Sequence, residues 1–537
     1  MKNKILSNVF SLTNLFYATV FIYLVIVLIP YAFVTHDGPS HLYNSHIINE
    51  LLFSDTSIYQ KFHAFNPDWA QPNLSGYIIL CLLQLIVPFL MAEKIMIALY
   101  VLIFSFGFKF YLKQITIYSD WYCLLVFPFL LNAVLFLGFY NFLIGLALSF
   151  WLIGLFEKYK KNLTGFRIIQ LLFLSLLIYY SHALVFILCG LYVAIQIIIE
   201  WINGGNRNKY TLIIYFKSIL VFIPGVFLFI IYLIQQKSAQ IEYGKTYSAL
   251  NRLSQLWFEM GSINFTGYSE RNYTKIFYII LIILAVIKLY QDFVKKKNIF
   301  NVTFIVFLSY ILLFLFIPDN AAGGGIITLR LNLMFFLFWI VWVSDVSLTK
   351  FTKVLILICY LINIALLNLR WSVIECGAIQ CKAIIESTDS IVKPNTVISS
   401  IHYKPVRGFI GEYQIHSYID FMSNLDNYVA IKHNLVTLHN YEAGNSSFAS
   451  YFPVIWKEHK NAEYIWQPIG SGEILEYFKL SEFENKWNHT PAMILSLGSF
   501  EKKEKFKPLW DSKNKYSLLK ADSVSFLNVY SLKEIKN

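Results

Sequence analysis

The chain has 537 residues, of which 57% are hydrophobic and 14% are charged, and its mean hydropathy is +0.56. This composition excludes an ordinary soluble enzyme and favours a membrane protein, because apolar runs of about 17 to 25 residues match the thickness of a bilayer. The formal net charge is +12, but the lysines gather in short loops between apolar runs, where they set orientation. We therefore expect no nucleic-acid partner.

The apolar runs predict a polytopic α-helical membrane protein. The first run, 14–34, follows a short basic head and lacks a small-residue cleavage site, so we expect a retained helix and not a removed signal peptide. The later runs fall at 74–91, 93–113, 121–137, 139–156, 166–181, 183–202, 211–234, 274–291, 300–317, 328–346 and 350–369.

The character of the sequence changes after Arg370. Four segments there are typical of strands, and "GEYQIHSYIDFMSNL" is typical of a helix. The four strand-like segments are "TVISSI", "NYVAIKHNLVTL", "PAMILSLGS" and "SVSFLNVYSL". We therefore predict a membrane domain over residues 1–370 and a soluble α/β domain over residues 371–537.

Lysine and arginine predict the orientation of the helices. The head "MKNK" places the N-terminus in the cytoplasm, so the loop that contains Asp37 lies outside. The basic loops at 157–167, 206–210, 295–298 and 347–353 then come out cytoplasmic. The same reasoning places 235–273, 318–327 and the C-terminal domain outside the membrane.

One segment conflicts with this orientation. The chain must cross an odd number of times between the outer loop at 73 and the inner loop at 157, yet four runs lie there. The simplest repair makes 121–137 a re-entrant half-helix, which is tolerated where protein or a wet cavity surrounds it. We thus expect about 11 membrane-spanning helices, or 13 otherwise, from runs of this length.

Unusual polar residues collect on the predicted outer side. They are Asp37 and His41 in the first loop, Tyr140 and Asn141 in "GFYNF", His182 in "YYSHALVF" and Arg330 after "GGG". Ionisable residues in membrane segments are costly and usually face a cavity or a partner. Each also has a structural interpretation: Asp37 could cap a helix, His182 could be a satisfied interfacial histidine, Arg330 could reach headgroups, and Asn141 could bond a neighbouring helix.

The opening loop "THDGPSHLYN" has an informative spacing. If Pro39 begins a helix, His41 and Asn44 share a face near Asp37. An acid beside an imidazole can act as a general base, or both can bind a divalent cation. The sequence has no HExxH, CxxC or phosphate-loop motif. Cys376 and Cys381 could form a disulfide, although a helix would hold them apart.

These motifs resemble the GT-C superfamily, the integral-membrane glycosyltransferases that use polyprenyl-phosphate-linked sugars. The resemblance rests on "THDGPSHLYN", "GFYNFLIGLALSFWL", "YYSHALV", the "GGG" before Arg330, and "LHNYEAG" at 438–444. It covers nearly the whole chain in architecture, although the motifs that carry it are short. It points to a bacterial branch of the superfamily and so implies a location in the bacterial inner membrane.

The resemblance implies an inverting transfer of a sugar from a polyprenyl-phosphate carrier to a glycan, lipid or protein acceptor outside the membrane. Asp37 would be the catalytic base, and Arg330 with His182 would neutralise the departing phosphate. His41, Tyr140 and Asn141 would be further substrate or phosphate contacts. Three residues would support the site: His36, Asn44 and Glu442.

The sequence departs from the family pattern in two places. Family members often carry paired acids where this chain has His36 before Asp37, so His36 or His41 could complete a site for a divalent cation such as Mg²⁺ or Mn²⁺. A WWD-type motif is absent, which argues against N-linked oligosaccharide transfer. Two alternatives stay open: a transporter or flippase of a lipid-linked glycan, and a non-catalytic membrane assembly subunit.

Overall fold

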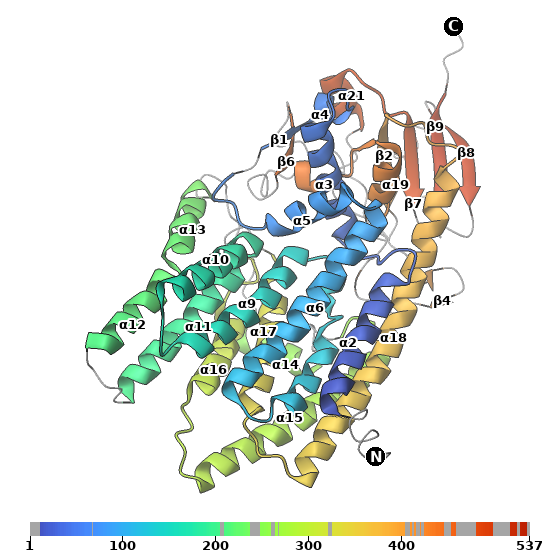
Figure 1. Cartoon of the computed structure of the whole chain (residues 1–537). Coiled ribbons are helices and arrows are strands. Elements are labelled where there is room, and N and C mark those ends of the chain that lie inside the picture. The colour runs from blue at the N-terminus through green and yellow to red at the C-terminus, as the bar shows by residue number, and fades with distance from the viewer. Residues whose placement is uncertain are drawn as a thin grey trace, which may run out of the picture.

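The computed structural model describes residues 11–533 with several gaps. The gaps are 67, 204–208, 237–247, 259–263, 267, 321–324, 403–408, 411–412, 415–418, 420–423, 445–452, 458–479, 498–515 and 523–526. The described chain forms a long helical bundle with a smaller mixed α/β region at one end (Figure 1).

Several helices of the bundle match the length of a bilayer. Among the described residues, six segments are long and apolar enough to span a membrane, or seven if a pair bent by 41° counts as one span. The six are α6 (Phe89–Ile115), Ser119–Phe136, α9 (Tyr140–Tyr159), α11 (Ala183–Ile202), Ser269–Val294 of α15 (Tyr268–Val294) and Lys350–Thr388, which is α18. The bent pair joins α12 (Lys209–Leu220) to α13 (Ile223–Gln236).

Shorter helices complete the bundle. The apolar ones are α2 (Leu12–Leu28), α5 (Ser75–Gln84), α10 (Gly165–Ser181), α16 (Val302–Phe316) and α17 (Ile327–Val343). The others in this part of the chain are α3 (Gly38–Phe53), α4 (Tyr59–Phe62), α7 (Ser119–Tyr122), α8 (Ala133–Phe136) and α14 (Ala249–Phe258). The expected apolar run at 74–91 is therefore divided, because α5 ends at Gln84 and Pro88 caps the start of α6.

The re-entrant interpretation of 121–137 is wrong. The Tyr122 hydroxyl donates to the Val346 carbonyl at one end of the bundle (3.0 Å), while the Phe136 carbonyl accepts from the His36 amide at the other (2.8 Å). The segment between them includes the 3-10 helix η1 (Cys123–Phe129), all of whose residues are buried. Helix α5 has ten residues, or about 15 Å, which is too short for a core of about 30 Å. Ser119–Phe136 is a candidate membrane span and α5 is not, which is compatible with an odd number of crossings between residues 73 and 157.

Helix α18 joins the bundle to the C-terminal region without a break. It has 39 residues and begins with a capping box at Thr349. The expected domain boundary at residue 370 falls inside this helix, where the buried Arg370 side chain bonds Glu270 (Nε to Oε1, 2.8 Å) and the Pro128 carbonyl (2.7 Å). Cys376 and Cys381 lie on the same helix, and both are free thiols.

The C-terminal region contains a five-stranded mixed sheet of order β5-β2-β7-β9-β8. Strand β2 is parallel to β5 and β7, whereas β9 is antiparallel to β7 and β8. The strands are β2 (Val397–His402), β5 (Val436–Thr437), β7 (Met493–Leu497), β8 (Tyr516–Asp522) and β9 (Leu527–Leu532). Two short pairs complete the described strands: β1 (His63–Phe65) with β6 (Val454–Trp456), and β3 (Phe409–Ile410) with β4 (Tyr413–Gln414).

Three of the four predicted strands are confirmed, at β2, β7 and β9. The segment 427–438 is different: it forms α19 (Asp426–His433), which ends at Asn434 in the left-handed conformation (φ 52°) before the short β5. Most of the helix expected at 411–425 lies outside the described residues, and its described residues 413–414 form β4. Two further helices are α20 (Tyr441–Gly444) and α21 (Leu480–Trp487).

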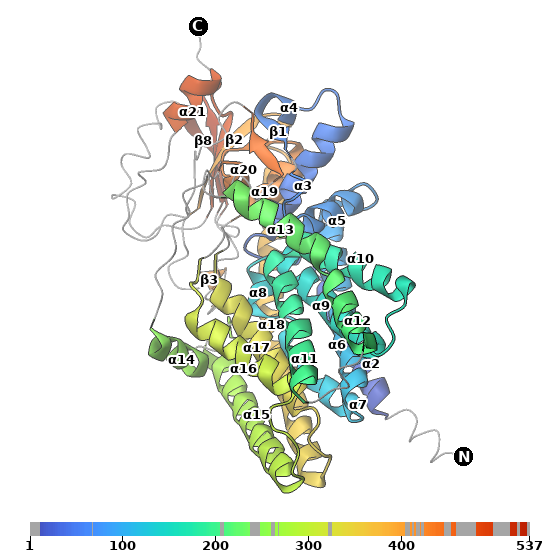
Figure 2. The ribbon, with the colours of Figure 1, turned by 90° about the vertical axis from the view of Figure 1, so that its left-hand side faces the viewer.

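The first loop of the chain packs against the C-terminal region. Strand β1 pairs with β6 in antiparallel register, with His63 opposite Trp456. Helix α3 lies beside α19, and the view of Figure 2 also places α19 and α20 next to α3. Residues 38–65 therefore pack against the C-terminal region, although Asn44 and its partner Glu442 are 398 positions apart in the sequence.

Candidate functional site

Asp37 stands where α2 gives way to α3. Helix α3 begins at Gly38 with Pro39 in its first turn, as the sequence predicts. Asp37 occupies the N-cap position, but its carboxylate makes no capping hydrogen bond. The capping interpretation therefore does not explain the acid. The Asp37 side chain is 16% exposed, and its Oδ1 lies 3.7 Å from His36 Nε2.

The backbone fixes this loop against the turn before α9. The Asp37 amide donates to the Leu137 carbonyl (3.1 Å), next to the bond between the His36 amide and the Phe136 carbonyl. Gly138 closes the turn with φ +83°, and a Cβ there would stand 2.6 Å from the Gly38 nitrogen. Only glycine fits both the conformation and the space, so the position of Asp37 is set by backbone contacts.

A buried acid, Glu93 of α6, lies directly behind Gly38. Its two oxygens accept hydrogen bonds from the Tyr140 and Tyr428 hydroxyls, each at 2.6 Å. The Tyr140 hydroxyl also bonds that of Thr35 (2.9 Å). A Cβ on Gly38 would overlap Thr35, Tyr140 and Glu93. Tyr140 is thus part of the support behind the loop.

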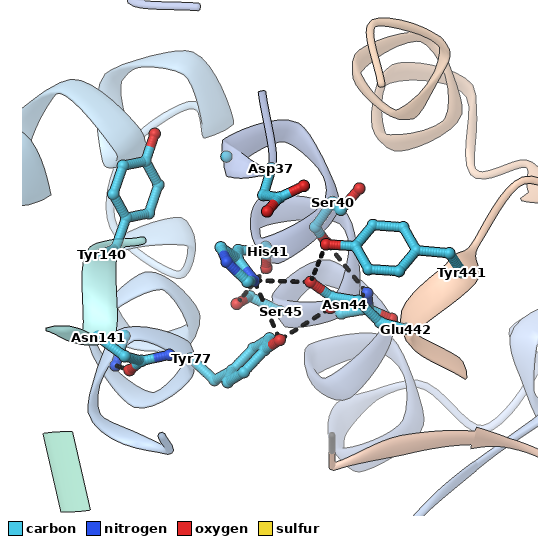
Figure 3. A network of polar contacts seen from close by, with 12 residues as sticks. Asp37, Ser40, His41, Asn44, Ser45, Tyr77, Tyr140, Asn141, Tyr441 and Glu442 are labelled. Carbon is cyan, nitrogen blue, oxygen red and sulfur yellow. Dashed lines mark hydrogen bonds and ion pairs between the residues drawn. The ribbon is translucent and has the colours of Figure 1, made fainter. Parts of the chain in front are cut away.

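A second buried acid, Glu442 of α20, faces α3 from the C-terminal region (Figure 3). Its Oε1 lies 2.7 Å from His41 Nδ1, and its Oε2 accepts from Asn44 Nδ2 (2.5 Å) and the Tyr77 hydroxyl (2.8 Å). The Tyr441 hydroxyl donates to Oε1 at 3.5 Å. The sequence prediction that His41 and Asn44 share a face of α3 is confirmed, and the acid on that face is Glu442.

The Glu442 carboxylate favours protonation of His41. Burial opposes protonation of the imidazole, but the charge and hydrogen bond of Glu442, with smaller contributions from Asp37 and Glu93, raise the pKa of His41 above its ordinary value. Burial likewise raises the pKa of Tyr441, together with the negative charges of Asp37 and Glu442. The negative charges of Asp37 and Glu442 thus act on both His41 and Tyr441.

Asn141 and His182 have different surroundings. Asn141 Oδ1 accepts a hydrogen bond from the Gly76 amide (2.6 Å) in the first turn of α5. Asn141 thus bonds a neighbouring helix, which was its structural interpretation. His182 separates α10 from α11, and its ring lies edge-on to Phe142 with centroids 5.2 Å apart. Among the described residues, His182 Nδ1 is buried without a hydrogen-bond partner.

Arg330 enters the site from the first turn of α17. The Asp319 carboxylate accepts from the Thr328 amide (3.0 Å) and hydroxyl, which holds the start of this helix. The Arg330 guanidinium lies 4.4 Å from the centroid of the Phe139 ring, and its Nε has no hydrogen-bond partner in the described part of the chain. Asp319 and Asp37 both act on Arg330 electrostatically, and Arg330 acts on His182.

The structure thus places the predicted residues in two groups around Asp37. His41, Asn44 and Glu442 form the face toward the C-terminal region, and Arg330 with His182 forms the face toward α17 and α11. Sequence reasoning missed Glu93, Tyr77 and Tyr441. Glu93 carried a usable signal, because an acid in the apolar run "FLMAEKIMIAL" is costly unless it is paired.

No three His, Cys, Asp or Glu side chains of the described residues form a group that could hold a metal ion. His36 and Asp37 are close to each other, whereas His41 is directed at Glu442. Comparison of the sequence with family models and with curated proteins gives no match.

Proposed function

We propose that the protein transfers a sugar from a polyprenyl-phosphate carrier to an acceptor at the surface of a bacterial inner membrane, with Asp37 as the general base. One observation carries this proposal. Of the three acids in the network, Asp37 is partly exposed, whereas Glu93 and Glu442 are fully buried. Glu93 and Glu442 accept hydrogen bonds from buried tyrosine, asparagine and histidine donors. Asp37 also has a tyrosine partner, the Tyr441 hydroxyl, so its exposure is what separates it from the other two acids.

The reaction needs a base and a fixed positive charge at the same place. In this proposal Asp37 accepts the proton of the acceptor hydroxyl as that oxygen bonds the anomeric carbon, and the bond from this carbon to the phosphate oxygen breaks. Arg330 stabilises the negative charge on the departing phosphate. Its unpartnered Nε and the unpartnered His182 Nδ1 are polar atoms that a phosphate could satisfy.

The remaining residues position the site. Glu442 orients His41 and Asn44 on α3, and Glu93 holds Tyr140 behind Gly38. Asn141 holds the start of α5. The partners are the lipid-linked donor, membrane lipid, and a glycan, lipid or protein acceptor. A divalent cation, Mg²⁺ or Mn²⁺, stays a separate question that activity with and without a chelator answers.

Asp37→Asn tests the proposal directly, because it keeps the shape of the side chain and removes its charge. We expect the variant to fold normally and to lose activity by about a hundredfold or more, which is typical of a general base. The measurement is transfer of labelled sugar from polyprenyl phosphate by the purified full chain. Asp55→Asn is a matched control, since Asp55 is exposed just beyond α3. Equal activity of Asp37→Asn and wild type would refute the role of Asp37.

The proposed orientation has its own test. We expect the N-terminus and residue 160 on the cytoplasmic side, and residues 371–537 on the opposite side. Single cysteines placed in a cysteine-free chain can be labelled with a membrane-impermeant reagent in intact cells. Lys161→Cys should stay unlabelled, whereas Asp55→Cys should react. The reverse pattern would invert the topology and place Asp37 in the cytoplasm.

A further inference from the structure

A hollow of about 420 Å³ lies between α2, α6 and α9, at the end of the bundle away from Asp37. That volume falls within the range of about 300 to 1,000 Å³ that is typical of ligand sites. Most of its wall is apolar, and two lysines stand beside it. The lining residues are Tyr17, Leu102, Ile103, Phe106, Lys109, Phe110, Lys113 and Trp151.

The aromatic wall of the hollow is held in place by close packing. Trp151 stacks on Phe110, with ring centroids 5.1 Å apart and planes 19° apart. The Trp151 indole N–H donates to the Ile103 carbonyl (2.9 Å), so its polar edge is satisfied within the protein. A Cβ on Gly107 would come within 2.7 Å of Trp151, and one on Gly154 within 2.7 Å of Phe110. Glycine at these positions lets α6 and α9 approach closely.

Lys109 and Lys113 lie one turn apart on α6 and place positive charge at one end of the hollow. The Lys109 ammonium is buried, lies 4.4 Å from the centroid of the Phe16 ring, and is 3.2 Å from Asp120 Oδ1. Despite this ion pair, its N–H groups make no hydrogen bond with adequate geometry to any described residue. Lys113 is exposed. With Asp120 offsetting one lysine, the three side chains leave a net charge of +1.

Helices α6 and α9 are candidate membrane spans, so in a bilayer we expect this surface to face lipid. An apolar hollow there has no water to fill it, and an empty one would forfeit the contacts of its walls. The ligand that satisfies both ends carries an acyl chain and a negative headgroup. We propose that the hollow binds an anionic phospholipid, with one acyl chain against Trp151 and Phe106 and the phosphate at Lys109 and Lys113. The site is separate from the one around Asp37 and does not depend on the proposed transferase activity.

Quenching by brominated lipids tests this site on the purified full chain. Dibrominated phosphatidylglycerol and dibrominated phosphatidylcholine would be titrated against the protein in detergent, and the tryptophan fluorescence followed. Since the chain has 12 tryptophans, the signal of the site is the difference between wild type and Trp151→Phe. We expect this difference signal to saturate at lower concentrations of phosphatidylglycerol than of phosphatidylcholine.

Charge variants test the role of Lys113. A lysine near an anionic headgroup contributes about 1 kcal/mol, which corresponds to about a fivefold change in affinity. We expect Lys113→Gln to weaken the phosphatidylglycerol titration about fivefold and to leave the phosphatidylcholine titration unchanged. Lys161→Gln removes an exposed lysine outside the hollow and should change neither titration. Lys113 is preferred to Lys109 because it is exposed and outside the ion pair with Asp120.

Competition identifies the occupant. Unlabelled phosphatidylglycerol should displace the brominated lipid, whereas inorganic phosphate at millimolar concentration should not. Displacement by inorganic phosphate would mean a soluble-anion site and would overturn the proposal. Tighter competition by polyprenyl phosphate than by phosphatidylglycerol would assign the hollow to the carrier instead and would also overturn it. Equal quenching by both brominated lipids, unaffected by Lys113→Gln, would show a non-selective surface.

Discussion

Glu442→Gln is the perturbation that tests the polar network most sharply. The carboxylate is fully buried and receives His41, Asn44 and Tyr77 at 2.5 to 2.8 Å. Glutamine keeps the shape, but its NH₂ group must face at least one of these donors. Breaking a buried charged pair costs about 3 to 5 kcal/mol, and an unsatisfied buried donor costs about 1 to 3 kcal/mol. We expect Glu442→Gln to lower the free energy of unfolding by about 3 to 5 kcal/mol while His41 is protonated.

The pH dependence of this loss follows from the raised pKa of His41. The unfolded pKa is about 6.5, so below that pH the imidazole is protonated in both states and the pair contributes fully. As the pH rises through the raised folded pKa, His41 loses its proton and the contribution of the charge is lost. The penalty of Glu442→Gln should therefore be largest near pH 6 and smaller by about 2 kcal/mol at high pH, where only neutral hydrogen bonds are lost.

The assay is the apparent melting temperature of the purified protein, measured as the fraction that stays monodisperse after heating. Wild type, Glu442→Gln, His41→Gln and the double variant form a cycle that isolates the coupling. Asp389→Asn is a matched control, because Asp389 pairs with Lys432 at 2.5 Å but is 42% exposed. Such a surface pair is worth about 0 to 1 kcal/mol. A coupling that grows with pH, or one no larger than the control, would refute the reasoning.

The remaining predictions concern the position of Asp37 and the charge opposite it. Gly138→Ala should lower both the melting temperature and the transfer activity, because φ is +83° and the added Cβ would meet the Gly38 nitrogen. Gly165→Ala is the control in the same melting assay, because its Cβ would meet nothing within 4 Å. Arg330→Lys should retain part of the transfer activity, since it keeps the charge but loses the fork of donors. Arg330→Ala should lose more, and unchanged donor affinity and turnover in this variant would remove Arg330 from the phosphate site.

The helical character of the bundle was predictable from hydropathy, but the expected 11 to 13 spanning helices exceed the six or seven candidate spans among the described residues. Hydropathy detects apolar length, but it does not show where a helix breaks. Pro88 separates α5 from α6, so the run at 74–91 does not form one helix. The segment 121–137 was interpreted as re-entrant only to restore an odd number of crossings. Its 3-10 portion rises about 2.0 Å per residue and contains Pro128, so fewer residues cross the same distance.

The site was predictable only in its local part. Pro39 and the spacing of His41 and Asn44 were enough to place both side chains on one face of α3. Their partner was not, because Asn44 and Glu442 are 398 residues apart, and no local pattern connects them. In the segment 427–438, the local pattern predicted the wrong kind of element. Its alternation favoured a strand, but the left-handed Asn434 ends a helix there.

The contacts of α3 show why the position of Asp37 depends on both ends of the sequence. Residues 424–442 bond successive turns of this segment. Asn424 donates to the His36 carbonyl (2.6 Å), Asn427 to the Ser40 hydroxyl (2.9 Å), and the Tyr43 hydroxyl to the Leu435 carbonyl (2.8 Å). Ser40 and Asn44 are buried, so losing these partners would leave polar groups unsatisfied at about 1 to 3 kcal/mol each.

Two supports therefore act on one loop. The bundle holds the backbone of Asp37 through Leu137 and Gly138, and the C-terminal region holds α3 through Asn427 and Glu442. In the proposed reaction the Asp37 carboxylate must meet both a lipid-linked group and a solute, so it needs a fixed position, because a small displacement of a reacting group is costly. The C-terminal region is thus part of what positions Asp37, and the function of the bundle cannot be understood without it.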